Sequence, residues 1–165
     1  MNALPHALVN AAALGTWPSG RLPGALFARV APFAAQMRFD LLTLEQVRGH
    51  SRSKIADTRT LVEFSAHPAS ASTHRLYAGR NANGPMDLPW LDVEKATVIG
   101  GGADFGDDTW IALDYRNTPE APRVVISTLE YDTAYGRTAE PARITWLELA
   151  ANVSNFLEMI HPRPK

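Results

Sequence analysis

The sequence predicts an α+β domain, in which an antiparallel sheet is flanked by helices at both ends of the chain. Apolar residues recur at helical spacing near both ends, whereas the middle carries short runs of strand-forming residues between turn residues. This segregation of helices from strands favours α+β over an alternating α/β fold. The chain has 165 residues and no recognisable interdomain linker. We therefore expect a single domain, residues 1–165, with a helical part over 1–58 and the sheet and last helix over 59–161.

The N-terminal part is expected to be helical but interrupted. Residues 5–14 are Ala-rich, and Gly15 should end a helix there. Residues 23–37 begin with a proline and carry apolar residues at helical spacing, so a second helix is expected. Pro32 should kink or split that helix. Thr43 is expected to cap a further short helical stretch.

Strand-forming residues begin after residue 59. Residues 60–64 form a short apolar run, and residues 76–77 are a weaker candidate. Two stronger strands are predicted at 110–115 and 123–131. The segment between these two carries two prolines, which predicts an antiparallel hairpin with a long loop.

The last helix is predicted from a capping box. Thr145 and Glu148 form the T-x-x-E pattern, in which each side chain satisfies a free backbone N–H of the other residue. A short strand around 142–144 should precede this helix, and Pro162 should prevent its continuation. An apolar stripe follows the cap and predicts that the helix docks on the sheet. The stripe consists of Trp146, Leu149, Val153, Phe156, Leu157 and Ile160.

Charge is unevenly distributed along the chain. Residues 1–80 carry nine Lys/Arg against four Asp/Glu, and residues 81–165 carry seven against thirteen. An acidic surface repels nucleic acid and attracts basic proteins or cations. The alternative is that the two halves neutralise each other inside one fold. The asymmetry is concentrated between residues 81 and 115, where Lys95 stands against Asp87, Asp92, Glu94, Asp104, Asp107, Asp108 and Asp114.

The segment 98–116 is the most informative part of this acidic region. Three consecutive glycines predict a sharp bend or a close backbone approach. We expect a flexible acidic loop that leads into the buried strand beginning at Trp110. Trp110 itself is either a core residue, which is favoured, or an exposed anchor. Asp114 and Tyr115 are expected to support the sheet. The glycines assigned to the structural loop are Gly100, Gly101, Gly102 and Gly106.

Several kinds of site are disfavoured. The glycine-rich run lacks the Lys and Ser/Thr of a phosphate-binding loop, and no cysteine or H-x-x-x-H pattern offers a zinc site. No cofactor, resident metal, nucleic acid or membrane partner is expected, and the absence of cysteine and of a signal-peptide pattern makes the cytoplasm the default location. A weak divalent-cation site at the aspartates remains an alternative. Acid/base chemistry by Asp107 and Asp108 is another, although adjacent residues of an extended strand point to opposite faces.

The order of these elements resembles the SUKH superfamily, which includes bacterial immunity proteins and a yeast regulator of cell-wall assembly. The resemblance covers about residues 95–160. It follows a pattern of glycine-aspartate loop, strand, aspartate, second strand, and terminal helix with a late Phe-Leu. The residues that carry it are Ile99 to Gly102, Gly106-Asp107, Trp110 to Asp114, Pro122 to Val125, Ile144 to Leu149 and Phe156-Leu157.

The resemblance implies a SUKH-like α+β fold and a non-catalytic role. Bacterial members typically bind and neutralise a toxin, often a nuclease, encoded beside them. An acidic surface can block the basic cleft of such a toxin by mimicking nucleic acid. The predicted partner-binding residues are Asp104, Asp107 and Asp108, with Asp87, Asp92 and Trp90 as extensions.

Two other functions remain open. One is a regulatory or scaffolding module with several protein partners, and the other is an enzyme that uses the aspartate cluster. The acidic-surface hypothesis also carries a structural requirement. It fails if these carboxylates are locked into internal pairs with arginines from the front of the chain.

Overall fold

The computed structural model describes the chain in segments. For residues 129–131 and 141–144 it describes the backbone only. The described residues are 3–18, 20–47, 88, 91, 95–104, 109–131 and 141–162. Their elements, in chain order, are α1 (His6–Ala13), β1 (Arg21–Pro23), the 3₁₀ helices η1 (Gly24–Leu26) and η2 (Pro32–Gln36), β2 (Arg38–Leu41), β3 (Ala96–Gly102), β4 (Trp110–Asp114), β5 (Arg123–Tyr131), β6 (Pro141–Ala150) and α5 (Val153–Ile160).

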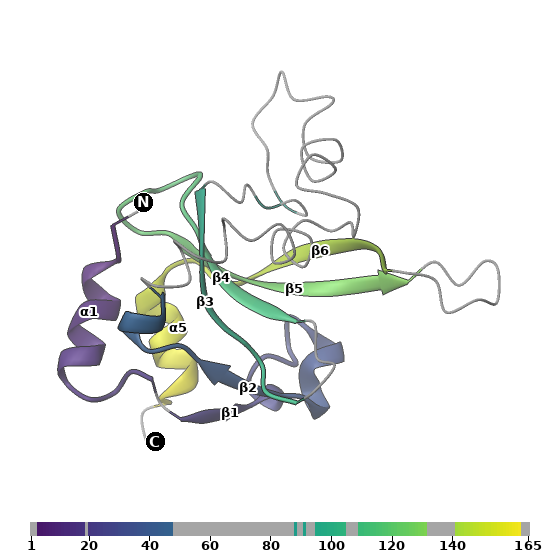
Figure 1. Ribbon diagram of the computed structural model, residues 1–165, viewed down its shortest axis with the longest axis horizontal. Coiled ribbons are helices and arrows are strands. Elements are labelled where there is room, and N and C mark those ends of the chain that lie inside the picture. The colour runs from purple at the N-terminus through teal and green to yellow at the C-terminus, as the bar shows by residue number, and fades with distance from the viewer. Residues whose placement is uncertain are drawn as a thin grey trace.

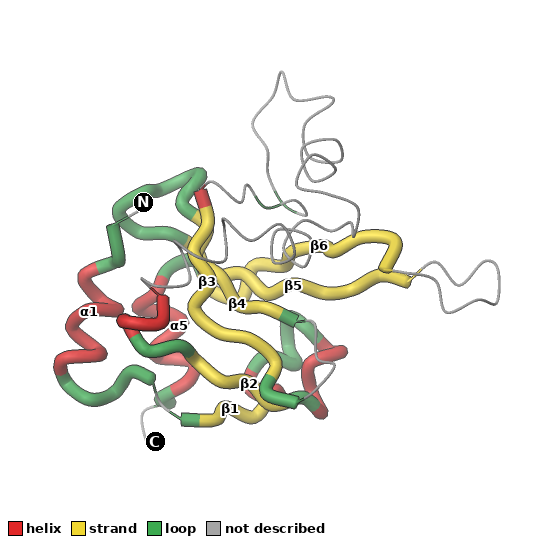
Figure 2. Tube along the Cα trace, viewed as in Figure 1, coloured by secondary structure: helices red, strands yellow, loops and turns green. Residues whose placement is uncertain are grey.

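The six strands form one antiparallel sheet in the order β1-β2-β3-β4-β5-β6, so each strand pairs with its neighbours in sequence (Figure 1). The helices α1 and α5 gather at one side of the sheet, as the red segments of Figure 2 show. The α+β class and the antiparallel sheet are therefore as predicted. Within the described residues, no helix is both long enough and apolar enough to cross a bilayer.

The main core lies between the sheet and the two helices. Phe156 of α5 is fully buried, with its ring 6.0 Å from that of Phe27 and 6.3 Å from that of Trp17. Phe27 also meets Phe39 of β2 edge to face, at a centroid distance of 5.2 Å. Such aromatic pairs contribute beyond the area they bury, by about 0.5–1.5 kcal/mol each. They join the first strands to the last helix.

A second, smaller apolar cluster lies on the opposite face of the sheet. Successive strand residues point to opposite faces, so β4 sends Ile111 and Leu113 to the main core and Ala112 to the second cluster. A strand buried on both faces appears in sequence as a continuous apolar run, which is what residues 110–113 show. The second cluster consists of Leu91, Ala96, Ala112, Val125 and Trp146, with Leu88, Val98 and Trp110 packed against it.

The hairpin prediction is confirmed, because β4 pairs antiparallel with β5 through the predicted loop. The first helix is confirmed as α1. The Thr43 cap is confirmed as well. The backbone N–H of Gln46 donates to Oγ1 of Thr43 at 3.1 Å, and the N–H of Thr43 donates to Oε1 of Gln46 at 2.8 Å. The predicted strands at 60–64 and 76–77 lie outside the described residues.

The prediction that residues 1–58 are helical is wrong in part, because β1 and β2 lie within them. Residues 23–37 form two short 3₁₀ helices instead of one kinked helix. Pro23 ends the edge strand β1, where its missing N–H costs no ladder hydrogen bond. Gly24 then packs against the backbone of η2, and its N–H donates to the Met37 carbonyl at 2.8 Å. These tertiary contacts outweigh the apolar spacing.

The predicted start of the last helix is also wrong. Thr145 and Glu148 lie inside the ten-residue strand β6, and α5 begins at Val153. The true N-cap is Asn152, whose side-chain oxygen accepts from the N–H of Asn155 at 2.9 Å. Strand and helix both send apolar residues into the core. The apolar residues therefore continue from β6 into α5, and their spacing does not mark where the strand ends and the helix begins.

Candidate functional site

The glycines 100–102 lie in strand β3, and the prediction that they form a loop is wrong. Close approach is the reason for two of them. A Cβ atom at Gly100 would lie 2.9 Å from the Asp40 carbonyl oxygen and 2.9 Å from the Leu41 side chain. A Cβ at Gly101 would lie 3.0 Å from the Trp110 ring. A bulge between Val98 and Gly100 accommodates this crowding.

Trp110 starts β4, directly opposite Gly101 in the register. Its ring lies over the glycine, and it packs against the second apolar cluster. The side chain is half-buried. This placement agrees with the favoured interpretation of Trp110 as a core residue.

Asp104 follows the end of β3 and is held by Arg38 of β2. The guanidinium donates through Nε and Nη2 to the two carboxylate oxygens, so the pair is bidentate. The Arg38 side chain is 56% exposed and the Asp104 side chain 42% exposed. The Arg38 hydrogen bond lowers the pKa of Asp104 below its ordinary value, and desolvation opposes this only partly. Asp104 therefore stays ionised at neutral pH.

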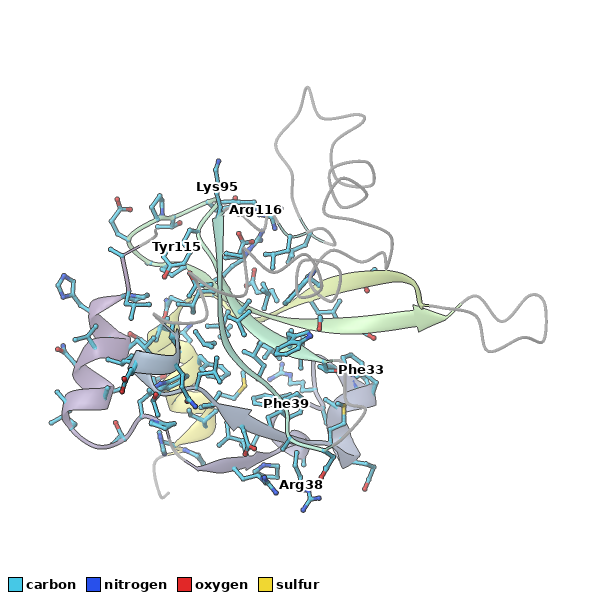
Figure 3. All side chains as sticks on the ribbon, viewed as in Figure 1. Phe33, Arg38, Phe39, Lys95, Tyr115 and Arg116 are labelled. Atoms are coloured by element: carbon cyan, nitrogen blue, oxygen red, sulfur yellow. The ribbon has the colours of Figure 1, made fainter. Side chains whose placement is uncertain are left out.

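A second exposed pair of the same geometry lies beside the first. Arg21 of β1 donates through Nε and Nη2 to the carboxylate of Asp40, its register partner on β2, at 3.0 and 3.1 Å. Because Arg38 and Asp40 are two residues apart, they share the face of β2 opposite to Phe39. Figure 3 shows Arg38 at the lower edge pointing away from the molecule and Phe39 lying within it. We name Arg21, Arg38, Asp40 and Asp104 the charge quartet.

A buried ion cluster lies at the other end of β3 and β4, where Figure 3 places Lys95, Tyr115 and Arg116. Asp114 is fully buried and accepts from the side chains of Arg116, at 2.8 Å twice, and Arg123, at 2.9 Å. Burial acts to raise the pKa of Asp114, but the two arginines outweigh it and the pKa is lowered. Asp114 thus has the supporting role expected from the sequence.

Tyr115, next to this cluster, lines an open cavity of about 280 Å³ between the start of α1 and the β4–β5 loop. Its hydroxyl is shielded from solvent and has no hydrogen-bond partner among the described residues. Burial raises the pKa of Tyr115 to about 12, although the nearby Thr97 hydroxyl acts in the opposite direction. Because the hydroxyl is closed to solvent, it offers nothing to a ligand in this cavity.

Of the predicted partner-binding residues, Asp104 is the one that the structure describes. It is paired with an arginine from the front of the chain, as the neutralisation alternative requires, but the pair lies on the surface and not inside the fold. Asp87, Trp90, Asp92, Asp107 and Asp108 lie outside the described residues, as does Gly106. Within the described ranges, no three His, Cys, Asp or Glu side chains come together as metal ligands.

The sequence did not single out Arg21, Arg38 or Asp40 as site residues. A signal for two of them was present in Arg38-Phe39-Asp40-Leu41, where charged and apolar residues alternate with the period of a half-buried strand.

Comparisons with protein-family models, curated proteins and solved structures found no match.

Proposed function

We propose that this chain is a non-catalytic binding protein of the SUKH type, which neutralises a basic toxin encoded by a neighbouring gene. Its contact surface is the end of β3, where Asp104 leads into the acidic residues 107 and 108. The proposal includes a cytoplasmic location, with which the absence of cysteine agrees.

The order of the described elements supports the resemblance. After β3, the chain continues with β4 ending in Asp114, then β5, β6 and a terminal helix that contains Phe156 and Leu157. The family pattern is a glycine-aspartate loop, a strand, an aspartate, a second strand and a terminal helix with a late Phe-Leu. The strands, the aspartate and the helix follow in that order here, whereas glycines 100–102 lie in strand β3 and not in a loop. The order of elements concerns the expected fold alone, and the partner must be identified by experiment.

One observation carries the proposed surface: the side chain of Asp104, just after the end of β3, is 42% exposed and accepts two hydrogen bonds from Arg38. A carboxylate fixed by a bidentate arginine loses little freedom when a partner docks. Arg38 also compensates the charge of Asp104, so Asp107 and Asp108 must supply most of the field that attracts a basic partner. The proposed mimicry of nucleic-acid charge therefore depends mainly on Asp107 and Asp108.

The test is binding to the purified product of the adjacent reading frame. Reversing Asp107 and Asp108 to Lys should weaken binding by at least about tenfold at low salt, mainly through a slower association rate. Glu45→Lys with Glu120→Lys is the matched control, because both are exposed acids outside the predicted acidic set and the double reversal changes the net charge by the same amount. Equal affinities of the wild type, the reversal variant and the control would contradict the proposed surface. Failure of the adjacent product to bind at all would contradict the proposed partner.

A further inference from the structure

The charge quartet brings alternating charges together on three neighbouring strands. Arg21 lies on β1, Arg38 and Asp40 on β2, and Asp104 just after β3. Each arginine is bound to one aspartate and is also influenced by the other. The pKa of Arg21 is raised chiefly by its hydrogen bond to Asp40 and further by the charge of Asp104. The four groups therefore form one electrostatic unit.

The quartet is exposed, and two hydrogen bonds hold each of its pairs together. The side chains of the Arg21–Asp40 pair are 51% and 49% exposed, close to those of the second pair. Long charged side chains normally lose rotamer freedom on binding, and the bidentate pairs have already removed much of it here. An exposed set of charges already held in pairs is suited to recognition, since a partner need not immobilise it.

Hydrogen-bonding capacity remains on every member of the quartet. An arginine has five N–H donors, and each pair uses two of them. An ionised carboxylate has about four lone-pair positions, and here it accepts two hydrogen bonds. Each arginine can thus bind a partner carboxylate, and each aspartate can bind a partner cation, without breaking the pairs already present.

We propose that the quartet is a recognition surface for a protein segment that carries opposite charges at every second residue. The spacing follows from geometry, because Arg38 and Asp40 are two residues apart on one face of β2, and an extended partner repeats on one face with the same period. The four charges sum to zero, so a uniformly basic segment gains at the aspartates what it loses at the arginines. This inference rests on the proposed binding function and defines the chemistry of the partner at that surface.

The test uses synthetic decapeptides and the ¹⁵N-labelled full chain at about 10 mM salt, where screening is weak. Three peptides share a Thr-rich frame with four charged positions at every second residue. The first alternates Glu and Lys, the second carries Lys at all four positions, and the third carries Glu. The readout is the shift of the Arg21 and Arg38 Nε–H signals. The alternating peptide should bind about three- to tenfold more tightly than either uniform peptide, the gain expected from a few cross-strand charge pairs.

A matched variant tests the role of the aspartates directly. Asp40→Asn with Asp104→Asn leaves two arginines on the surface, so this variant should prefer the Glu peptide over the alternating one. The inference is overturned if the Lys peptide binds the wild type at least as tightly as the alternating peptide, or if no peptide shifts the two arginine signals. Neither result depends on the toxin, so failure of this inference is distinguishable from failure of the proposed function.

Discussion

Replacing Asp114 by asparagine is expected to remove a large part of the stability of this domain. The carboxylate is fully buried and receives four hydrogen bonds: three from the side chains of Arg116 and Arg123 and one from the Arg116 backbone N–H at 3.1 Å. The Arg116 side chain is 5% exposed and that of Arg123 12%, so neither can turn to water. Asparagine has nearly the same shape, but it carries no charge and directs an NH₂ group toward donors.

The expected magnitude follows from the two arginines left behind. Removing one partner of a buried ion pair costs about 3–5 kcal/mol, because the remaining charge is buried without compensation. Glu148 is bound to Arg123 at 3.6 Å but is 44% exposed, and both arginines make further interactions, so 3–5 kcal/mol is the upper range of the expected loss. Domains are stable by about 5–15 kcal/mol in total. For a chain of this size, a loss of 3–5 kcal/mol lowers the melting temperature by roughly 6–20 °C.

Urea denaturation measures the effect. The midpoint should fall while the slope of free energy against urea stays constant, which would show that stability changed and not the surface exposed on unfolding. Asp40→Asn is the control for stability, because it removes an aspartate from an exposed bidentate pair and should leave the midpoint nearly unchanged. If Asp114→Asn shifts the midpoint no more than the control does, the inferred role of the buried ion cluster is incorrect.

The same residue predicts a pH dependence. Its pKa is lower in the folded state than in the unfolded chain, where it is about 4. Its contribution is therefore present above about pH 4 and is lost as the pH falls through the lower folded value. The stability difference between wild type and Asp114→Asn should be constant from pH 5 to 7 and shrink below about pH 4. A difference that stayed constant down to pH 2 would contradict this assignment.

Substitutions at three further positions test the packing, the helix cap and the buried hydroxyl. Gly24→Ala makes a Cβ overlap with the Ala34 carbonyl oxygen, so it should cost about 3 kcal/mol or more in urea denaturation, and a cost under 1 kcal/mol would refute this close approach. Asn152→Ala should cost about 1 kcal/mol while Asn152→Asp retains stability, because only the latter can cap α5; equal losses would argue against the cap. Tyr115→Phe should leave the free energy of unfolding unchanged or raise it by about 1 kcal/mol, since it deletes a buried hydroxyl without a partner. A loss of stability in this variant would instead identify a hydrogen bond, with Thr97 as its partner.

Local patterns in the sequence predicted those elements that depend on interactions between residues close together in the chain. The apolar runs of β4 and β5 mark strands because both faces are buried, and the prolines between them mark the loop. Thr43 was expected to cap a helical stretch, and the structure shows that its hydrogen-bond partner, Gln46, lies within one turn. In each case the deciding interaction joins residues close together in the chain or repeats with one period.

The misplaced helix start shows where such reasoning fails. The T-x-x-E pattern at Thr145 is a valid cap signal, but pairing along the full length of β5 satisfies the same backbone groups in a strand. The glycines of β3 were assigned to a loop for a similar reason. Glycine is needed at positions 100 and 101 because Leu41 and the Trp110 ring leave no room for a Cβ atom, and both of these side chains come from other strands.

By itself, the sequence determined the α+β class, the antiparallel pairing of β4 with β5 and the presence of an acidic region between residues 81 and 115. The tertiary structure alone decided which charges meet. Arg38 and Asp104 are 66 residues apart, and only the pairing of β2 with β3 brings them together. Strand periodicity acts along the chain, whereas an ion pair requires two distant segments at hydrogen-bonding distance. For this reason the aspartate could be singled out from sequence, and the arginine that holds it could not.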